Sequence, residues 1–256
     1  MIPTALSIAG SDPSGGAGIQ ADLKTFMDLG VYGMAAVTAI TVQNTQGVHE
    51  VHPLPADLVG RQVQAIMEDL PVGAIKIGMV SQSAEVIREA LQHHDVPIIL
   101  DPVLASSSGT PFATSQSLPA LRALARQATL VTPNTPELEA LLDGAQPASW
   151  AQETGTAVLH TGGHGQSEAL QDVLYLPSGR CIRTAHPRIS SRATHGTGCT
   201  LSSAIAAGMA RGWPLDRAVD AAIDATVELI ALSADHPLGQ GTSPLLHGLL
   251  KPADPS

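Results

Sequence analysis

The stretch Pro97-Ile-Ile-Leu-Asp-Pro-Val103 is a short apolar run that stops at an acidic residue followed by a proline. Similar apolar runs recur along the chain, several of them ending at Gly, Asp or Asn, and they cover residues 5–9, 35–42, 74–77, 129–131 and 157–159. Runs of this length between turn-forming residues predict buried β-strands.

Helical segments are expected between these strands, with Gly30 as the C-cap of the first, and they cover residues 17–29, 56–69, 83–93, 115–126 and 136–142. Alternation of strand and helix predicts an α/β fold, with a mostly parallel central sheet and helices on both of its faces. Ligands of such folds bind outside the carboxyl ends of the strands. We therefore looked for functional residues in the loops that follow the predicted strands.

The pattern changes in the second half of the chain. Residues 172–176 and 180–183 are two strand-like runs around Pro177-Ser-Gly179, which predicts a β-hairpin. Two Ala-rich helices are expected at residues 199–211 and 215–233, separated by Gly212-Trp-Pro214. No internal repeat or long linker divides the sequence, so we expect a single domain over residues 1–256.

Composition narrows the class of protein. The chain is 44% hydrophobic and 14% charged, with a formal net charge of -10, which disfavours binding to nucleic acid or to an anionic membrane surface. Aromatic residues make up only 2%, too few for a base-stacking platform. Cys181 and Cys199 are the only cysteines, and neither a basic leader nor an apolar run of the roughly 18 residues that a membrane span needs is present. These features predict a cytoplasmic protein.

The loop Gly196-Thr197-Gly198-Cys199 stands directly before one of the Ala-rich helices. Free amides and the positive end of the helix dipole would converge there, and glycines let an anion approach the backbone, so the loop is a candidate anion site. An ordinary helix cap is the alternative. A thiol at a helix N-terminus is expected to have a depressed pKa, which would let Cys199 accept a proton, although a buried cysteine is more often a small hydrophobic residue.

Two further regions offer polar side chains at strand ends. The glycine-rich turn from Gly10 to Gly18 lacks the standard nucleotide-binding fingerprints, and is either a flexible turn or a loop that folds over a ligand and offers Asp12 or Asp22 as an acceptor. Asp101 and the segment Asn134-Thr-Pro-Glu137 follow two other predicted strands. Carboxylates there can hold a hydrated Mg²⁺. For the second segment, helix capping by Thr135, Pro136 and Glu137 is the stronger explanation by itself, and it leaves only Asn134 without a role.

Taken together and in order, several motifs resemble the hydroxymethylpyrimidine/phosphomethylpyrimidine kinases of thiamine biosynthesis, which belong to the ribokinase-like superfamily. The resemblance spans nearly the whole chain and rests on residues 9–22, 38–47, 76–79, 101–103, 132–137, 195–202 and 239–244. It implies a three-layer α/β/α ribokinase-like fold and an ATP-dependent, Mg²⁺-requiring phosphorylation of 4-amino-5-hydroxymethyl-2-methylpyrimidine and its monophosphate. It also implies a homodimer, because related folds often pair.

The resemblance assigns roles to individual positions. The pyrimidine would contact Gly10, Asp12, Asp22, Gln43, Met79 and Val103. In particular, Asp22 would accept from the ring amino group, and the Gln43 amide would offer both a donor and an acceptor. ATP and its phosphates would contact Asn134, Thr161, Thr194 and His195. Asp101 and Glu137 would hold Mg²⁺. Gly196, Thr197 and Gly198 would neutralise the transferred phosphoryl group, and Cys199 would be the proton acceptor or an oriented substitute for it.

One departure from the family pattern concerns Val158-Leu-His-Thr-Gly-Gly-His164, where Thr161 stands at the position that usually holds Lys. Loss of that cation would weaken the grip on nucleotide phosphates. Three other functions stay open at this point: a pyridoxal kinase, a non-catalytic protein that binds a vitamin ring, and a hydrolase using Cys199 and His195. Gln43 favours the pyrimidine over pyridoxal.

Overall fold

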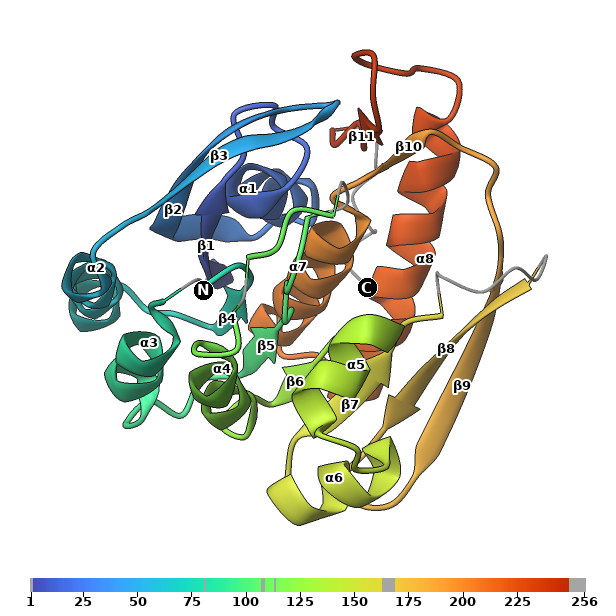
Figure 1. The fold of residues 1–256 in the computed structure, drawn as a ribbon. Helices are drawn as coiled ribbons and strands as arrows, with labels where there is room; N and C mark the ends of the chain where they lie inside the picture. The colour runs from blue at the N-terminus through green and yellow to red at the C-terminus, as the bar shows by residue number, and fades with distance from the viewer. Residues whose placement is uncertain (1, 81, 107–108, 113, 163–168, 249–256) are drawn as a thin grey trace.

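The centre of the molecule is a mixed, mostly parallel sheet (Figure 1). The structure is a computed structural model and describes residues 2–248 except 81, 107–108, 113 and 163–168. Within these residues the main sheet has nine strands, in the order β3 (Gly47–Pro53), β2 (Tyr32–Asn44), β1 (Thr4–Ser11), β4 (Ala74–Ile77), β5 (Ile98–Leu100), β6 (Leu130–Val131), β7 (Ala157–His160), β8 (Ala169–Tyr175) and β9 (Cys181–Pro187). The central strands β2, β1, β4, β5, β6 and β7 are parallel to one another, whereas the outer strands β3, β8 and β9 pair antiparallel with their neighbours.

Helices cover both faces of the sheet, as the sequence predicted (Figure 1). One face carries α2 (Ala56–Asp69), α3 (Ala84–Leu91), α4 (Leu118–Ala125), α5 (Thr135–Leu142) and α6 (Pro147–Thr154). The other carries α1 (Gly18–Asp28), α7 (Thr197–Ala210) and α8 (Leu215–Ser233). The three-layer α/β/α architecture is therefore confirmed.

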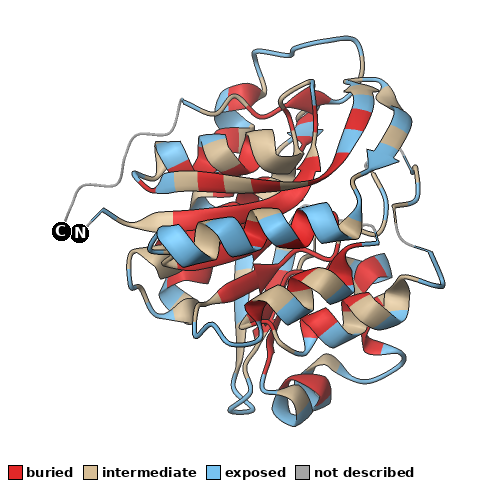
Figure 2. Cartoon of the chain, turned by 90° about the vertical axis from the view of Figure 1, so that its left-hand side faces the viewer, coloured by how far each residue is buried: buried red, intermediate tan, exposed pale blue. Residues whose placement is uncertain are grey.

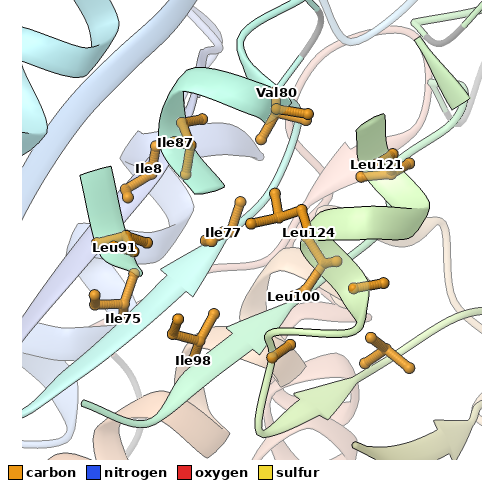
Figure 3. Close-up of a cluster of buried hydrophobic side chains, with 14 of the residues drawn as sticks. Ile8, Ile75, Ile77, Val80, Ile87, Leu91, Ile98, Leu100, Leu121 and Leu124 are labelled. Atoms are coloured by element: carbon orange, nitrogen blue, oxygen red, sulfur yellow. The ribbon is translucent and has the colours of Figure 1, made fainter. Parts of the chain in front are cut away.

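Each helical layer is held to the sheet by its own apolar cluster. On the α3 and α4 side, side chains such as Ile77 and Leu100 from the strands meet Ile87 and Leu124 from the helices (Figure 3). The central strands β1, β4, β5, β6 and β7 are almost entirely buried, whereas the outer strands β3 and β9 are half-buried or exposed, and the helices turn their exposed sides outward (Figure 2). Burial of apolar surface on both faces explains why these strands appear in the sequence as continuous hydrophobic runs.

The register of the parallel strands aligns their carboxyl ends. Ile8 pairs with Ile77, Ile77 with Leu100, Leu100 with Val131, and Val131 with Val158. The loops that follow these residues consequently leave the sheet at one edge. That edge is where the sequence predicted the functional side chains.

Some elements differ from the sequence prediction. The hairpin of β8 and β9, the strand β4 and the helix α8 are confirmed, but β3 and α6 were not predicted. Nor was the small parallel pair of β10 (Ala193–His195) and β11 (Ser243–Pro244). Among the described residues, no helix is both long and apolar enough to cross a membrane. The single domain over residues 1–256 stays a prediction.

Candidate active site

The amino end of α7 presents unpaired backbone amides. Gly196 is its N-cap, in the left-handed conformation at φ 82, and a Cβ at this position would come 1.8 Å from the carbonyl oxygen of Gly16. Only glycine fits there. The Thr200 amide donates to the Gly196 carbonyl at 2.9 Å, and no side chain caps the helix, so the amides of residues 197–199 remain available for an anion.

Asp12 holds the glycine-rich turn in shape. Its carboxylate accepts hydrogen bonds from the amides of Ser14 (2.9 Å), Gly16 (3.2 Å) and Ala17 (2.8 Å), and from the Ser14 hydroxyl (2.7 Å). Burial by itself raises the pKa of Asp12, but the hydrogen bonds from His195 and Ser14 lower it below its usual value. With its oxygens occupied by the protein, Asp12 fits the role of a loop organiser better than the substrate contact that the resemblance implied.

His195 connects this turn to the anion loop and to β2. Its Nε2 lies 2.8 Å from the Asp12 carboxylate and 3.2 Å from the terminal amide of Gln43. The imidazole therefore joins the glycine-rich turn to Gln43 of β2. Since these contacts occupy its Nε2, they count against the expected contact with nucleotide phosphates.

Gly10 and Met79, two of the residues expected at the pyrimidine ring, touch each other. A Cβ on Gly10 would overlap the Met79 methyl group, at 2.2 Å. Met79 is held at the end of β4 because its carbonyl accepts a hydrogen bond from the Thr38 hydroxyl at 2.6 Å. Val103, the third expected ring contact, is half-buried two residues after Asp101, and its role stays a prediction.

Asp22 lies in a different environment from the one expected. Asp22 and Lys76 form an ion pair at 2.8 Å, and neither side chain is exposed to solvent. The carboxylate also accepts hydrogen bonds from the hydroxyls of Ser7 (2.6 Å) and Ser203 (2.8 Å). Its oxygens have no access to a ring amine, so the structure counts against this role. Sequence reasoning gave Lys76 no role, although a lone lysine inside a buried strand requires a charged partner.

Cys199 is the clearest correction. Its pKa is raised to about 12 instead of depressed, chiefly because burial disfavours the thiolate; the charge of Lys76 opposes this shift, and the charges of Asp22 and Asp101 add to it. The thiol is therefore protonated at neutral pH. The position of Cys199 at a helix N-terminus, from which the sequence predicted a low pKa, is therefore outweighed by burial of the thiol.

Asp101 and Glu137 are two buried carboxyl groups at the ends of the adjacent strands β5 and β6. Burial raises the pKa of Asp101 to about 6, against the opposing charge of Lys76. Burial and the charge of Asp101 raise the pKa of Glu137 to about 7. Asp101 also faces α7, since a Cβ on Gly198 would come 3.6 Å from its Oδ2. Two crowded carboxyl groups opposite free amides are suited to a cation bound with an anion.

The residues expected at the nucleotide are spread over several loops. Asn134, and not Thr135, is the N-cap of α5. Asn134 and Glu137 form a capping box: the Asn134 side chain accepts a hydrogen bond from the Glu137 amide at 3.0 Å, and the Asn134 amide donates one to the Glu137 carboxylate at 3.0 Å. The Thr161 amide donates to the Pro133 carbonyl at 3.1 Å. Thr194 is exposed beside the anion loop. Gly163 and His164 lie outside the described residues.

A closing segment, residues 239–243, ties the turn between β2 and β3 to the loop before the anion site. The Thr242 amide donates to the Thr45 carbonyl at 2.8 Å, and Arg192 donates to the carbonyls of Gln240 (3.0 Å) and Gly241 (2.9 Å). A Cβ on Gly241 would come 1.9 Å from the Thr45 carbonyl oxygen. Sequence reasoning noted the glycines of this segment only as part of a resemblance, because its partners lie far away along the chain.

This arrangement was then compared with known proteins. The family model described as phosphomethylpyrimidine kinase matches residues 12–246. The chain belongs to the phosphomethylpyrimidine kinase family. A hydroxymethylpyrimidine/phosphomethylpyrimidine kinase of Rhizobium meliloti is 43% identical, covering 96% of this chain and 97% of the relative. A multifunctional thiamine biosynthesis protein, ThiED, of Corynebacterium efficiens is 38% identical, and the match covers 35% of its length.

Solved structures agree with the family assignment. The pyridoxal kinase of Bacillus subtilis, solved as an ADP complex, superimposes with a TM-score of 0.84 and 33% identity, covering 98% of this chain and 99% of that one. The phosphomethylpyrimidine kinase of Clostridium difficile 630 superimposes with a TM-score of 0.75 and 36% identity, covering 88% and 98%. The ribokinase-like fold of the phosphomethylpyrimidine kinase family and an ATP-dependent kinase activity are thus supported for this chain.

Proposed function

We propose that this protein transfers the γ-phosphoryl group of ATP to 4-amino-5-hydroxymethyl-2-methylpyrimidine and to its monophosphate. The observation that carries the proposal is the set of amides at residues 197–199, which lie near Asp101 and directly follow His195, the partner of Gln43. Phosphoryl transfer is largely dissociative, so a site that positions reactants and stabilises charge supplies most of the rate. Membership of the family supports the same substrate.

Within this proposal, the ring lies between Gln43 and the contact of Gly10 with Met79, with Val103 nearby. Its hydroxymethyl group points to the amino end of α7, whose amides stabilise the phosphoryl group during transfer. Cys199 keeps its proton at neutral pH and serves by shape and hydrogen bonding more than as a base. The phosphates of ATP extend toward the exposed Thr194 and the loops of Asn134 and Thr161.

The carboxyl pair of Asp101 and Glu137 fits a divalent cation. Burial raises the pKa of both groups, and the charge of Asp101 adds to the shift at Glu137, so a cation here would stabilise their ionised forms. Mg²⁺ is commonly bound by one or two carboxylates together with substrate phosphates. When bound, Mg²⁺ would neutralise charge on the ATP phosphates. The same cation would offset the absence of a lysine at Thr161.

The homodimer is part of the proposal. Ile40 and Val42 of β2 are each 45% exposed, and burial of such side chains against a second copy would stabilise a dimer. Sedimentation velocity of the wild-type chain and of an Ile40→Glu/Val42→Glu variant tests this. A monomeric wild-type protein would remove the dimer from the proposal without affecting the proposed reaction.

The main test is an ADP-release assay with ATP and MgCl2, using the pyrimidine alcohol, its monophosphate and pyridoxal as separate acceptors. Pyridoxal is the second candidate, because the pyridoxal kinase of Bacillus subtilis superimposes closely on this chain. We expect the highest kcat/KM on the pyrimidine. A higher value on pyridoxal would replace the proposed substrate, and no turnover with any ring would favour a non-catalytic ring-binding protein.

A further inference from the structure

Two polar side chains meet at one imidazole nitrogen next to the anion loop. His195 Nε2 lies 2.8 Å from Asp12 Oδ2 and 3.2 Å from the terminal atom of Gln43 that is assigned as nitrogen. Asp12 and His195 are buried, and Gln43 is half-buried. Hydrogen bonds in such a place have fixed directions, because water cannot substitute for a missing partner.

The carboxylate determines where the hydrogen on His195 lies. Asp12 already accepts from the amides of Ser14 and Ala17 and has a pKa below its usual value, so it is ionised and has no proton to donate. A short contact of 2.8 Å between this carboxylate and an imidazole nitrogen requires that the nitrogen donates. His195 therefore carries a hydrogen on Nε2, whether the ring is neutral or protonated.

This hydrogen in turn determines the orientation of the Gln43 amide. A protonated Nε2 and an amide NH2 group are both donors and would repel each other at 3.2 Å. The nitrogen and oxygen of a carboxamide have nearly the same shape, so their assignment follows from the hydrogen-bond network. The Gln43 atom beside His195 is accordingly the oxygen, and the NH2 group occupies the other terminal position.

That other position is open. Among the described residues, the second terminal atom of Gln43 has no hydrogen-bond partner and is not one of the buried unpaired atoms. It therefore faces accessible space next to His195. In the proposed site, this is the space that receives the substrate ring.

We propose that Asp12 and His195 orient Gln43 with its oxygen inward and its NH2 group toward the bound ring, so that this position selects a ring atom with a lone pair. The inference rests on the proposed function and narrows it. A ring nitrogen is bound here, whereas an NH or amino group of the ring is rejected by the facing NH2 group. Asp12 and His195 are positioning residues that act through Gln43.

The orientation itself is tested without turnover. Long-range ¹H–¹⁵N correlation spectra of the full chain, without substrate, report which nitrogen of His195 carries hydrogen. We expect a protonated Nε2. An unprotonated Nε2 would overturn the inference even if the protein proves to be an active kinase.

The selectivity is tested with paired ligands. The pyrimidine alcohol is compared with its pyridine analogues, in each of which one ring nitrogen is replaced by CH. Loss of a ring acceptor opposite the Gln43 NH2 group is expected to raise the KM of one analogue by about 10- to 100-fold, at unchanged KM for ATP. Gln43→Glu keeps an oxygen toward His195 but removes the NH2 group, so it should raise the KM of the pyrimidine similarly and abolish the difference between pyrimidine and that analogue.

A matched pair of variants tests the positioning role. His195→Gln places an NH2 group where Nε2 stands and should retain the preference for the ring nitrogen. His195→Leu removes the donor, frees the Gln43 amide to rotate, and should lose that preference. Equal preference in His195→Leu and wild type, or an unchanged KM in Gln43→Glu, would refute the inference. Absence of turnover by the wild-type protein with any ring would instead refute the proposed function.

Discussion

Replacement of Gly198 by alanine separates the chemistry of the anion loop from its folding. Gly198 is the second residue of α7, and a Cβ there meets nothing closer than Asp101 Oδ2, at 3.6 Å. This is an ordinary van der Waals distance, so the backbone need not move. Alanine is also up to about 1 kcal/mol more favourable than glycine in a helix. The free energy of unfolding should therefore stay unchanged or rise.

The same methyl group would obstruct the site. It would lie between the free amides of α7 and Asp101, where the transferred phosphoryl group has to fit. Alanine keeps its backbone N–H, but an anion held away by the methyl group would lose a hydrogen bond to these amides, and loss of one such bond in an oxyanion site typically lowers kcat by roughly 100- to 1,000-fold. We expect a loss of kcat in this range for Gly198→Ala, measured by ADP release at saturating ATP and pyrimidine, alongside urea denaturation of the same samples.

Two comparisons sharpen this experiment. Gly196→Ala should unfold at lower urea concentration, because its φ of 82 and the 1.8 Å approach to Gly16 forbid a side chain. Cys199→Ser should lower kcat by less than about 10-fold, because a thiol with a pKa of about 12 contributes little as a base at neutral pH. A Gly198→Ala enzyme within threefold of wild type, or equal losses from Gly198→Ala and Cys199→Ser, would refute the reasoning.

Three more predictions follow from the buried charges and the closing segment. The pKa values of Asp101 and Glu137, about 6 and 7, are raised above their unfolded values near 4, so their contribution to stability is complete below pH 4 and is lost as pH rises to 7. Mg²⁺ should consequently raise the melting temperature more at pH 8 than at pH 5, and an equal shift at both would contradict a site at this pair. Lys76→Met leaves the buried Asp22 carboxylate without its ion-pair partner and should lower the free energy of unfolding in urea by about 3–5 kcal/mol. Lys24→Met removes only an exposed hydrogen bond to the Gly15 carbonyl and should lower it by less than about 1 kcal/mol. Similar losses in the two variants would contradict the expected effect of burial. In Gly241→Ala, the added methyl group would collide with the β2–β3 turn and push the closing segment away from it. The KM for pyrimidine should therefore rise severalfold more than the KM for ATP. Equal changes in the two constants would count against a role of this segment at the pyrimidine end of the site.

The fold was predictable where periodicity is strong and local. The helix at residues 215–233 has the predicted bounds because its apolar positions repeat over five turns. The edge strand β3 was missed because His49, Glu50 and His52 make it polar and exposed, and an edge strand needs no continuous apolar run. The helix α6 was missed because it is short, and packing of Trp150 and Ala151 in the apolar cluster on this face of the sheet contributes to its stability.

The site was predictable in position but not in electrostatics. The sequence located the anion loop at Gly196, because glycine before an Ala-rich helix is a local signal. It could not give the pKa of Cys199, which depends on burial and on the charges of Lys76, Asp22 and Asp101, nor the pairing of Asp22 with Lys76, 54 residues away. Properties that arise from segments distant in sequence require the three-dimensional arrangement.

The closing segment has a consequence for how the protein becomes competent during synthesis. The contact between Gly241 and Thr45 joins residues 196 positions apart, and such long loops close late. A nascent chain on the ribosome can pair its first strands long before residues 239–243 have emerged, yet nothing then fastens the β2–β3 turn against the loop of Arg192. Substrate recognition would thus depend on a segment translated long after β2 and β3, so that chains lacking this segment would not sequester the substrate.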